Sequence, residues 1–94
     1  MSEVKVTQNA EQQRYEAHLE GEMAGFAAYQ LDDDVVVFTH TEVDSAYEGE
    51  GVGGSLVRGA LDDVRSKGGH KVLARCPFVA SWIDKHPDYA DLLA

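Results

Sequence analysis

The fold is decided by the stretch Glu48-Gly49-Glu50-Gly51-Val52-Gly53-Gly54-Ser55 and the segment that follows it, Leu56 to Val64. Apolar residues recur here at the spacing of one face of a helix. They are Val52, Leu56, Val57, Ala60, Leu61 and Val64. Gly68-Gly69 should end this helix, because glycine readily adopts the left-handed conformation found just past a helix. The preceding glycines lack Cβ atoms, so their N–H groups and the helix N-terminus could approach a phosphate.

Other interpretations of the glycine pattern stay open. The spacing Gly49-x-Gly51-x-x-Gly54 matches the dinucleotide-binding fingerprint. However, His70 and Lys71 stand about twenty positions on, where that fold places an acidic residue for the ribose. Ser55 follows Gly54 directly, so no lysine stands where a P-loop needs one to reach the phosphates. A glycine turn that only reverses the chain is the remaining alternative.

Length, charge and cysteine content limit the class of protein. The 94 residues predict a single domain spanning 1–94. A net charge of −9 argues against nucleic acid as a partner. No apolar run approaches the ~20 residues of a membrane span, and no secretory leader is recognisable. With one cysteine, Cys76, we expect a cytoplasmic protein. Its small core suggests a monomer or a weak homodimer.

Alternation of apolar and polar residues predicts four strands before the glycine-rich stretch. They cover residues 4–7, 14–19, 23–29 and 35–43. The third continues the period of two through Met23, Gly25, Ala27 and Tyr29. Short connections between them predict an antiparallel meander. The fourth begins apolar on both faces and becomes polar after Phe38, which suggests that it leaves the core and enters a site.

The order of the remaining elements predicts a βαβ unit. Residues 72–74 form a fifth strand, which the crossover helix places parallel to the fourth. Ligands bind at the carboxyl ends of such strands, so residues 44–54 should face Arg75 and Cys76. Pro77 suits the first position of a second helix, which His86-Pro87 ends. Phe78, Val79, Trp82 and Ile83 would form its apolar face, and residues 88–93 should pack back on the body.

Three of these segments resemble the GNAT superfamily of acetyl-CoA-dependent N-acetyltransferases, and within it the branch with the shortest chains. His40-Thr41-Glu42-Val43 matches the end of the family's fourth strand. The segment from Glu48 to Gly53 aligns with the family's Arg/Gln-x-x-Gly-x-Gly/Ala pyrophosphate loop. Cys76-Pro77-Phe78-Val79 with His86-Pro87-x-Tyr89 matches the C-terminal signature of that branch. The resemblance implies an α/β (α+β) fold. A mixed GNAT-like sheet would combine an antiparallel meander with a βαβ unit, its last two strands splayed, followed by a C-terminal helix.

The resemblance also implies an acetyl-CoA site. Backbone N–H groups of residues 50–54 would hold the pyrophosphate, and the strand edge around Thr41 to Val43 would pair with the pantetheine amides. The thioester would lie in the splay and transfer its acetyl group to a primary amine of a small molecule or a protein. The cofactor-binding residues predicted in this way are Thr41, Glu42, Val43, Glu48, Gly49, Glu50, Gly51, Val52, Gly53, Gly54, Ser55, Pro77 and Phe78.

The loop departs from the family in its charge. Glu48 and Glu50 stand where an arginine and a glutamine are usual. One like-charge pair at ~8 Å costs about 0.5 kcal/mol in a water-like dielectric, so several such pairs would weaken CoA binding by one or two powers of ten. Arg58, Arg75 and Lys85 could offset this effect.

Four residues are candidates for the chemistry of transfer. Cys76 stands beside Arg75 at the predicted start of a helix, an arrangement that favours a thiolate; otherwise it is a small buried side chain. His40 and Glu42 share one strand face and could act as the base, or they belong to a solvated face. Tyr89 could donate a proton to the departing thiolate, or it is a packing aromatic.

No metal site is predicted, because the histidines show no ligand spacing with Cys76. Three functions follow from these observations. The first is acetyl transfer from acetyl-CoA to an amine. The second is an acyl-CoA-binding module of the same fold with little turnover, which the acidic loop favours. The third is an interaction protein that has lost the ligand.

Overall fold

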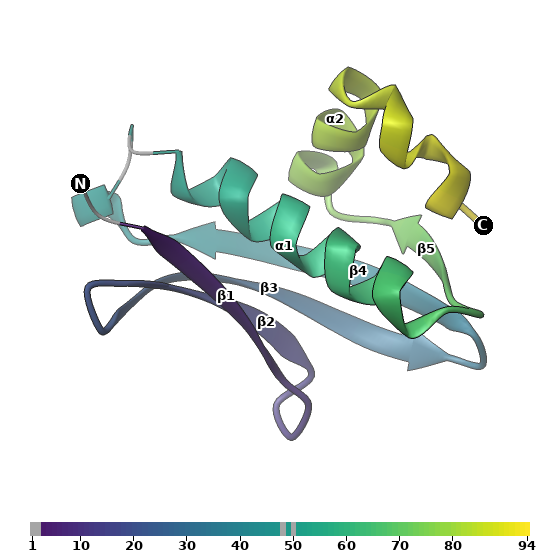
Figure 1. Ribbon diagram of the computed structural model, residues 1–94, viewed down its shortest axis with the longest axis horizontal. Helices are drawn as coiled ribbons and strands as arrows, with labels where there is room; N and C mark the ends of the chain where they lie inside the picture. Colours follow the sequence, from purple (N-terminus) through teal and green to yellow (C-terminus); the bar gives the residue numbers. More distant parts are fainter. Residues whose placement is uncertain (1–2, 48, 50) are drawn as a thin grey trace.

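The computed structural model describes residues 3–47, 49 and 51–94, and these form a five-stranded sheet with two α-helices (Figure 1). The elements are β1 (Val4–Asn9), β2 (Arg14–Leu19), β3 (Glu22–Asp32), β4 (Val35–Val43), the 3₁₀ helix η1 (Ser45–Tyr47), α1 (Val52–Lys67), β5 (Lys71–Ala74), α2 (Pro77–Lys85) and the 3₁₀ helix η2 (Pro87–Leu92). Each predicted strand and helix is therefore present, and β1 and β3 extend beyond their predicted ends.

The sheet is mixed, as predicted. Its strand order is β1-β2-β3-β4-β5, with the first four strands antiparallel and β5 parallel to β4. Short turns join the first four strands, whereas α1 crosses the sheet to connect β4 with β5 (Figure 1). This arrangement is the meander followed by a βαβ unit that the sequence indicated.

β4 and β5 pair over only part of their length. Their parallel register joins residues 35–38 of β4 to residues 71–74 of β5. At the end of this ladder the carbonyl oxygen of Phe38 accepts hydrogen bonds from the N–H groups of Arg75 and Cys76, both at 3.0 Å. β4 then continues to Val43, paired with β3 alone among the described strands. The two strands therefore part at Phe38, which confirms the predicted splay.

Helix α1 packs along the helix-bearing face of the sheet. All six residues of its predicted apolar stripe are buried, and they form one core with β2, β3 and β4. Gly59 allows α1 to approach β1 closely, because a Cβ at that position would lie 2.7 Å from Cβ of Val6. The helix ends at Gly68, as predicted, but its φ of 66° and ψ of 155° lie in a region open mainly to glycine rather than in the left-handed helical conformation that the sequence indicated.

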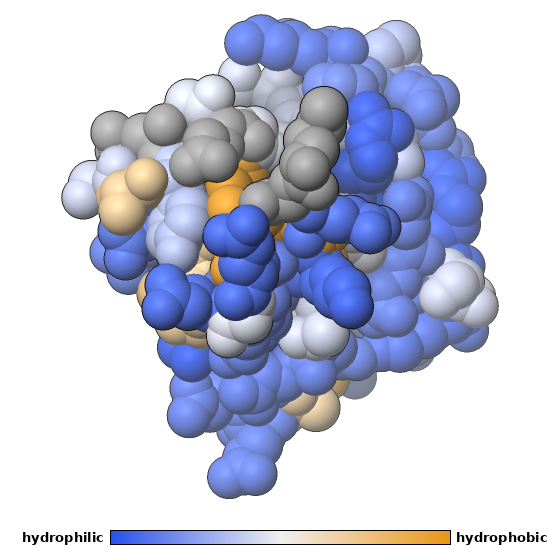
Figure 2. Space-filling view, turned by 60° about the vertical axis from the view of Figure 1, so that its left-hand side comes forward, coloured by the Kyte–Doolittle hydropathy of each residue, from blue (hydrophilic) through white to orange (hydrophobic). Residues whose placement is uncertain are grey.

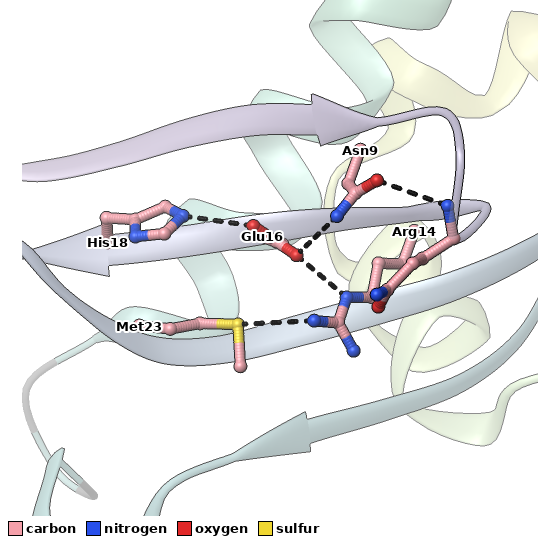
Figure 3. A network of polar contacts seen from close by, with 6 residues as sticks. Asn9, Arg14, Glu16, His18 and Met23 are labelled. Atoms are coloured by element: carbon pink, nitrogen blue, oxygen red, sulfur yellow. Dashed lines mark hydrogen bonds and ion pairs between the residues drawn. The ribbon is translucent and has the colours of Figure 1, made fainter.

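Both α-helices lie on one face of the sheet, and the other face carries a polar network (Figures 1 and 3). The carboxylate of Glu16 accepts hydrogen bonds from Arg14 Nε at 2.8 Å and Asn9 Nδ2 at 3.1 Å, with His18 Nε2 at 3.2 Å. The hydrogen bond from Arg14 is the main reason that the pKa of Glu16 lies below its usual value. The guanidinium of Arg14 also lies 4.9 Å from the centre of the Phe26 ring.

The strict alternation predicted for the third strand is wrong at its start. Ala24 is fully buried, whereas Met23 is 40% exposed. The register between β2 and β3 shifts between Ala17 and His18, so Met23 lies on the polar face beside Arg14 (Figure 3). Such a bulge cannot be recognised from a short run of small residues.

Candidate functional site

The unpaired half of β4 presents its two sides to different surroundings. Thr41 pairs with the fully buried Ala27, and Val43 packs against the core on the helix-bearing side. His40 and Glu42 point to the opposite, polar face, where both side chains are 61% exposed. The splay is therefore lined on one side by Thr41 and Val43 and on the other by His40 and Glu42.

Cys76 lies where the two strands part. It is the N-cap of α2, as predicted, although its side chain does not cap the helix. Its Sγ lies 3.3 Å from Thr41 Oγ1, and the residue is only 4% exposed. The thiol is thus inside the protein and directed at β4. This position fits a small packing residue, and it also places a thiol at the apex of the splay, so its catalytic role stays a prediction.

The N-terminus of α1 has no described side-chain cap. Gly51 is its N-cap and adopts the left-handed conformation, with φ 75°. Its carbonyl accepts the first helical hydrogen bond, from the Ser55 N–H at 3.1 Å. Helix geometry leaves the N–H groups before Ser55 without intrahelical partners. Those of residues 52–54 are therefore suited to an anion, which the positive end of the helix dipole also attracts.

A hollow of about 300 Å³ lies between this helix N-terminus, the end of β4 at Val43 and the first turn of α2. It is lined by Val43, Tyr47, Gly49, Gly51, Val52, Gly53, Gly54 and Phe78. Figure 2 views the molecule from the side on which α1 begins, where hydrophobic atoms show mainly in a recess within a hydrophilic surface. The hollow therefore brings together most of the predicted cofactor-binding residues from three separate segments.

Phe78 is 44% exposed, although the sequence placed it on the buried face of its helix. Its ring lies against Gly53, where a Cβ would come within 2.7 Å of the ring carbon Cζ. Phe78 thus forms a wall of the hollow, and Gly53 gives it room. The contact joins the first turns of α1 and α2.

The other predicted cofactor-binding residues lie beside the hollow or outside the described chain. Thr41 and Glu42 belong to the free half of β4, and Pro77 is at the first turn of α2, where it has no N–H to offer. The N–H of Ser55 is already used within α1. Glu48 and Glu50 lie outside the described residues.

A second, smaller hollow of about 190 Å³ opens at the end of β3 and β4. It is lined by Met23, Ala24, Gly25, Phe26, Glu42, Val43 and Asp44. His40 Nε2 lies 3.4 Å from Glu42 Oε2, and its ring meets Phe26 edge-on at 6.2 Å. Two carboxylates thus border an apolar depression on the polar side of the splay.

Tyr89 lies beside the middle of α1 rather than at its start. Its hydroxyl donates to Asp62 Oδ1 at 2.7 Å, and this hydrogen bond is the main cause of its raised pKa. Asp62 is two helical turns beyond Gly54, the last glycine of the hollow. The structure therefore gives Tyr89 a packing and anchoring role, and its role as a proton donor stays a prediction.

Two residues of the site region were not predicted. Tyr47 lines the larger hollow and donates to Glu22 Oε2 at 2.9 Å, which raises the pKa of its phenol. Trp82 was expected only in the core, and it is 8% exposed. Its Nε1 nevertheless approaches the start of α1, because a Cβ on Gly54 would lie 3.6 Å from it. The only signal in the sequence for either residue was that Tyr47 is an aromatic residue directly before the glycine-rich loop.

Within residues 3–47, 49 and 51–94, no three His, Cys, Asp or Glu side chains gather as metal ligands would. In the same part of the chain, no helix has the length and apolar character needed to cross a membrane.

Comparison with known proteins agrees with the fold. Residues 14–92 match the family described as GCN5-related N-acetyl-transferase. A GCN5-like protein from Staphylococcus aureus has a solution structure similar to this one, with a TM-score of 0.73 and 23% identity over 100% of this chain and 91% of that one. The crystal structure of the ribosomal-protein-S18-alanine N-acetyltransferase from Escherichia coli gives a TM-score of 0.67 at 15% identity, over 92% and 76% of the two chains. None of the curated proteins compared matches the sequence.

The splayed mixed sheet and the glycine turn before α1 are thus the fold of a transferase superfamily. The chain belongs to the GCN5-related N-acetyltransferase family, since the match covers most of its length. This confirms the resemblance noted in the sequence.

Proposed function

We propose that the protein transfers an acetyl group from acetyl-CoA to a primary amine. One observation carries the proposal. The uncapped N-terminus of α1 and the free half of β4, at its end Val43, border the same hollow, whose lining also includes Gly51, Gly53 and Phe78. A phosphate-binding turn and an open strand edge within one groove suit a long ligand that is anionic at one end and carries amides along its arm.

The described residues fit such a ligand. The N–H groups of Val52, Gly53 and Gly54 would hold its pyrophosphate, and the edge of β4 at residues 39–43 would pair with its amides. Phe78 would pack against its arm from the side of α2. This fit rests on main-chain groups, so it does not require the side chains of Glu48 or Glu50.

The transfer forms a C–N bond, breaks the C–S bond of the thioester, removes a proton from the amine and returns one to the thiolate. Two sides of β4 are available for these proton transfers. On the helix side, the Cys76 thiol and the Thr41 hydroxyl lie 3.3 Å apart at the apex of the splay. On the polar side, His40 and Glu42 form an exposed pair able to take a proton from an incoming ammonium group.

The acceptor would enter from the polar side. Glu42 and Asp44 border the smaller hollow, whose other lining includes Met23 and Phe26. Carboxylates attract an ammonium group, and the apolar lining suits an alkyl chain. This combination favours a primary amine on an aliphatic stem, such as a lysine side chain or a polyamine.

The first test separates binding from turnover. Acetyl-CoA at about 100 times its Kd would stabilise the fold by about 2.7 kcal/mol, which raises the Tm of a domain this size by about 10 °C or more. Release of free thiol in the presence of an amine panel would then measure transfer. Stabilisation without thiol release for any amine would favour the acyl-CoA-binding module. No stabilisation by CoA or acetyl-CoA would contradict both functions.

A second prediction concerns Cys76. If its thiol serves the transfer, Cys76→Ala lowers kcat about tenfold or more, in keeping with the loss of an acid–base group. The Kd for CoA, measured by calorimetry, is expected to stay within about threefold of the wild-type value. The phosphates of CoA would bind at the start of α1, where Gly51 to Gly54 line the hollow. An unchanged kcat together with a lower Tm would instead assign Cys76 to packing alone.

A further inference from the structure

Trp82 carries a hydrogen-bond donor that no described residue satisfies. The residue is 92% buried, since 8% of it is exposed, yet no described residue accepts a hydrogen bond from its indole nitrogen. Within the described chain, every fully buried side-chain nitrogen or oxygen has a hydrogen-bond partner. Because the indole nitrogen has none, it must be in contact with solvent. A buried tryptophan N–H usually finds an acceptor. This donor instead opens beside Gly54, whose Cβ would lie 3.6 Å from Nε1.

Arg58 lies one helical turn beyond Gly54 and is held against the same indole. Its guanidinium carbon is 5.3 Å from the centre of the Trp82 ring and 5.8 Å from that of Tyr89. Two other cations of the same helix form ion pairs, Arg65 with Asp91 and Lys67 with Asp63, whereas Arg58 forms none with a described carboxylate. The rings of Trp82 and Tyr89 therefore hold a positive charge beside α1, one helical turn beyond Gly54, without an ion-pair partner among the described residues.

We propose that Trp82 and Arg58 complete the anion site at the N-terminus of α1 and bind a phosphate group of the acyl-CoA substrate. The indole N–H adds a rigid donor to the N–H groups of residues 52–54, and Arg58 adds the charge. Such a charge is needed here, because the chain has a net charge of −9 and a CoA molecule carries several negative charges of its own. This inference rests on the proposed function and assigns the phosphate end of that site.

The wild-type protein offers a direct probe, because Trp82 is its only tryptophan. Indole fluorescence would be followed during titration with CoA, dephospho-CoA, inorganic pyrophosphate and pantetheine. We expect CoA and pyrophosphate to change the emission, and pantetheine, which has no phosphate, to leave it unchanged. A response to dephospho-CoA equal to that with CoA would assign the pyrophosphate, and a weaker response would assign the 3′-phosphate. Emission that stays constant while calorimetry shows CoA saturation would overturn the inference.

Substitutions test the two residues separately. Arg58→Gln is expected to raise the Kd for CoA about tenfold at low ionic strength and less at high salt, because salt screens an exposed charge. Lys5→Gln is the matched control. It removes the same charge from an exposed position on β1, at the opposite edge of the sheet from β5, and should change the Kd less than twofold. Trp82→Phe keeps an aromatic ring but removes the N–H, and should raise the Kd about five- to tenfold.

The outcomes separate this inference from the proposed function. Wild-type affinity for CoA in both Arg58→Gln and Trp82→Phe would overturn the roles of Arg58 and Trp82 and leave the transferase proposal intact. Equal losses in Arg58→Gln and Lys5→Gln would show only a general effect of net charge and would also overturn it. If the wild-type protein bound neither CoA nor pyrophosphate, both proposals would fail. Should Trp82→Phe fail to fold, the fluorescence titration and Arg58→Gln still decide the question.

Discussion

Gly25→Ala is expected to lower the Tm by about 10–15 °C. A Cβ at this position would lie 2.6 Å from the carbonyl oxygen of Glu42 and 3.2 Å from Cα of Val43. Both are backbone atoms of the strand paired with β3, so no side chain can move aside to relieve the contact. Overpacking of this kind costs about 2–3 kcal/mol, and 1 kcal/mol shifts the Tm of a small domain by about 4–8 °C.

Gly54→Ala provides the matched control for this substitution. Its Cβ would meet only Trp82 Nε1, at the ordinary contact distance of 3.6 Å, and it lies within α1. Alanine is favoured over glycine in a helix by about 1 kcal/mol, so the Tm should stay the same or rise by about 5 °C. Calorimetric unfolding of both variants checks the pair. Equal losses of Tm in both would show that the close approach of β3 to β4 is not the cause.

Much of the fold could be predicted because each element carries a strong local signal. The stripe from Val52 to Val64 specified both the helix and its buried face, and Gly68 marked its end. The order of strand, glycine turn, helix and strand then fixed the parallel pairing of β4 with β5. The polar second half of β4 indicated where that pairing ends.

Contacts between segments distant in the sequence could not be predicted in the same way. The shift in register beside Ala17 turns Met23 outward, and it depends on how two strands fit together rather than on either sequence. Helical spacing placed Phe78 with Trp82 on the apolar face of the second helix, whereas the family resemblance placed it among the cofactor-binding residues. Its ring lines the hollow against Gly53. A helical pattern predicts on which face of its helix a residue lies. It does not predict whether the neighbouring helix covers that residue or leaves it exposed.

The candidate site shows the same division. Its main-chain part, at Gly51, Gly53 and Gly54, followed from glycine spacing because only the backbone is needed there. Its side-chain part includes Tyr47 and Trp82, which reach the site through packing of η1 and α2. Tyr89 belongs to the C-terminal signature of the family branch, but its hydroxyl donates a hydrogen bond to Asp62. Glycine spacing therefore marked the turn at the start of α1, whereas the roles of the chemical groups stay predictions.

Gly51→Val is expected to raise the Kd for CoA about a hundredfold. Gly51 is the N-cap of α1 at φ 75°, and a β-branched residue is strained there even though nothing lies within 4 Å of its Cβ position. The turn should leave the left-handed conformation and redirect the N–H groups of Val52 and Gly53. A hydrogen bond to a charged group contributes about 1.5–3 kcal/mol, and each 1.4 kcal/mol is tenfold in Kd.

Gly68→Val tests whether that loss reflects the site or only the strain. Gly68 is the cap at the other end of the same helix, with φ 66° and an equally open Cβ position. Both variants should lower the Tm by about 5–10 °C, since each forces a branched side chain into a positive φ. Only Gly51→Val should lose CoA, with the Kd of Gly68→Val within about twofold of wild type by calorimetry. If both variants bound CoA equally well, the N-terminus of α1 would not be where the anion is held, because the two substitutions differ chiefly in the helix end that they disturb.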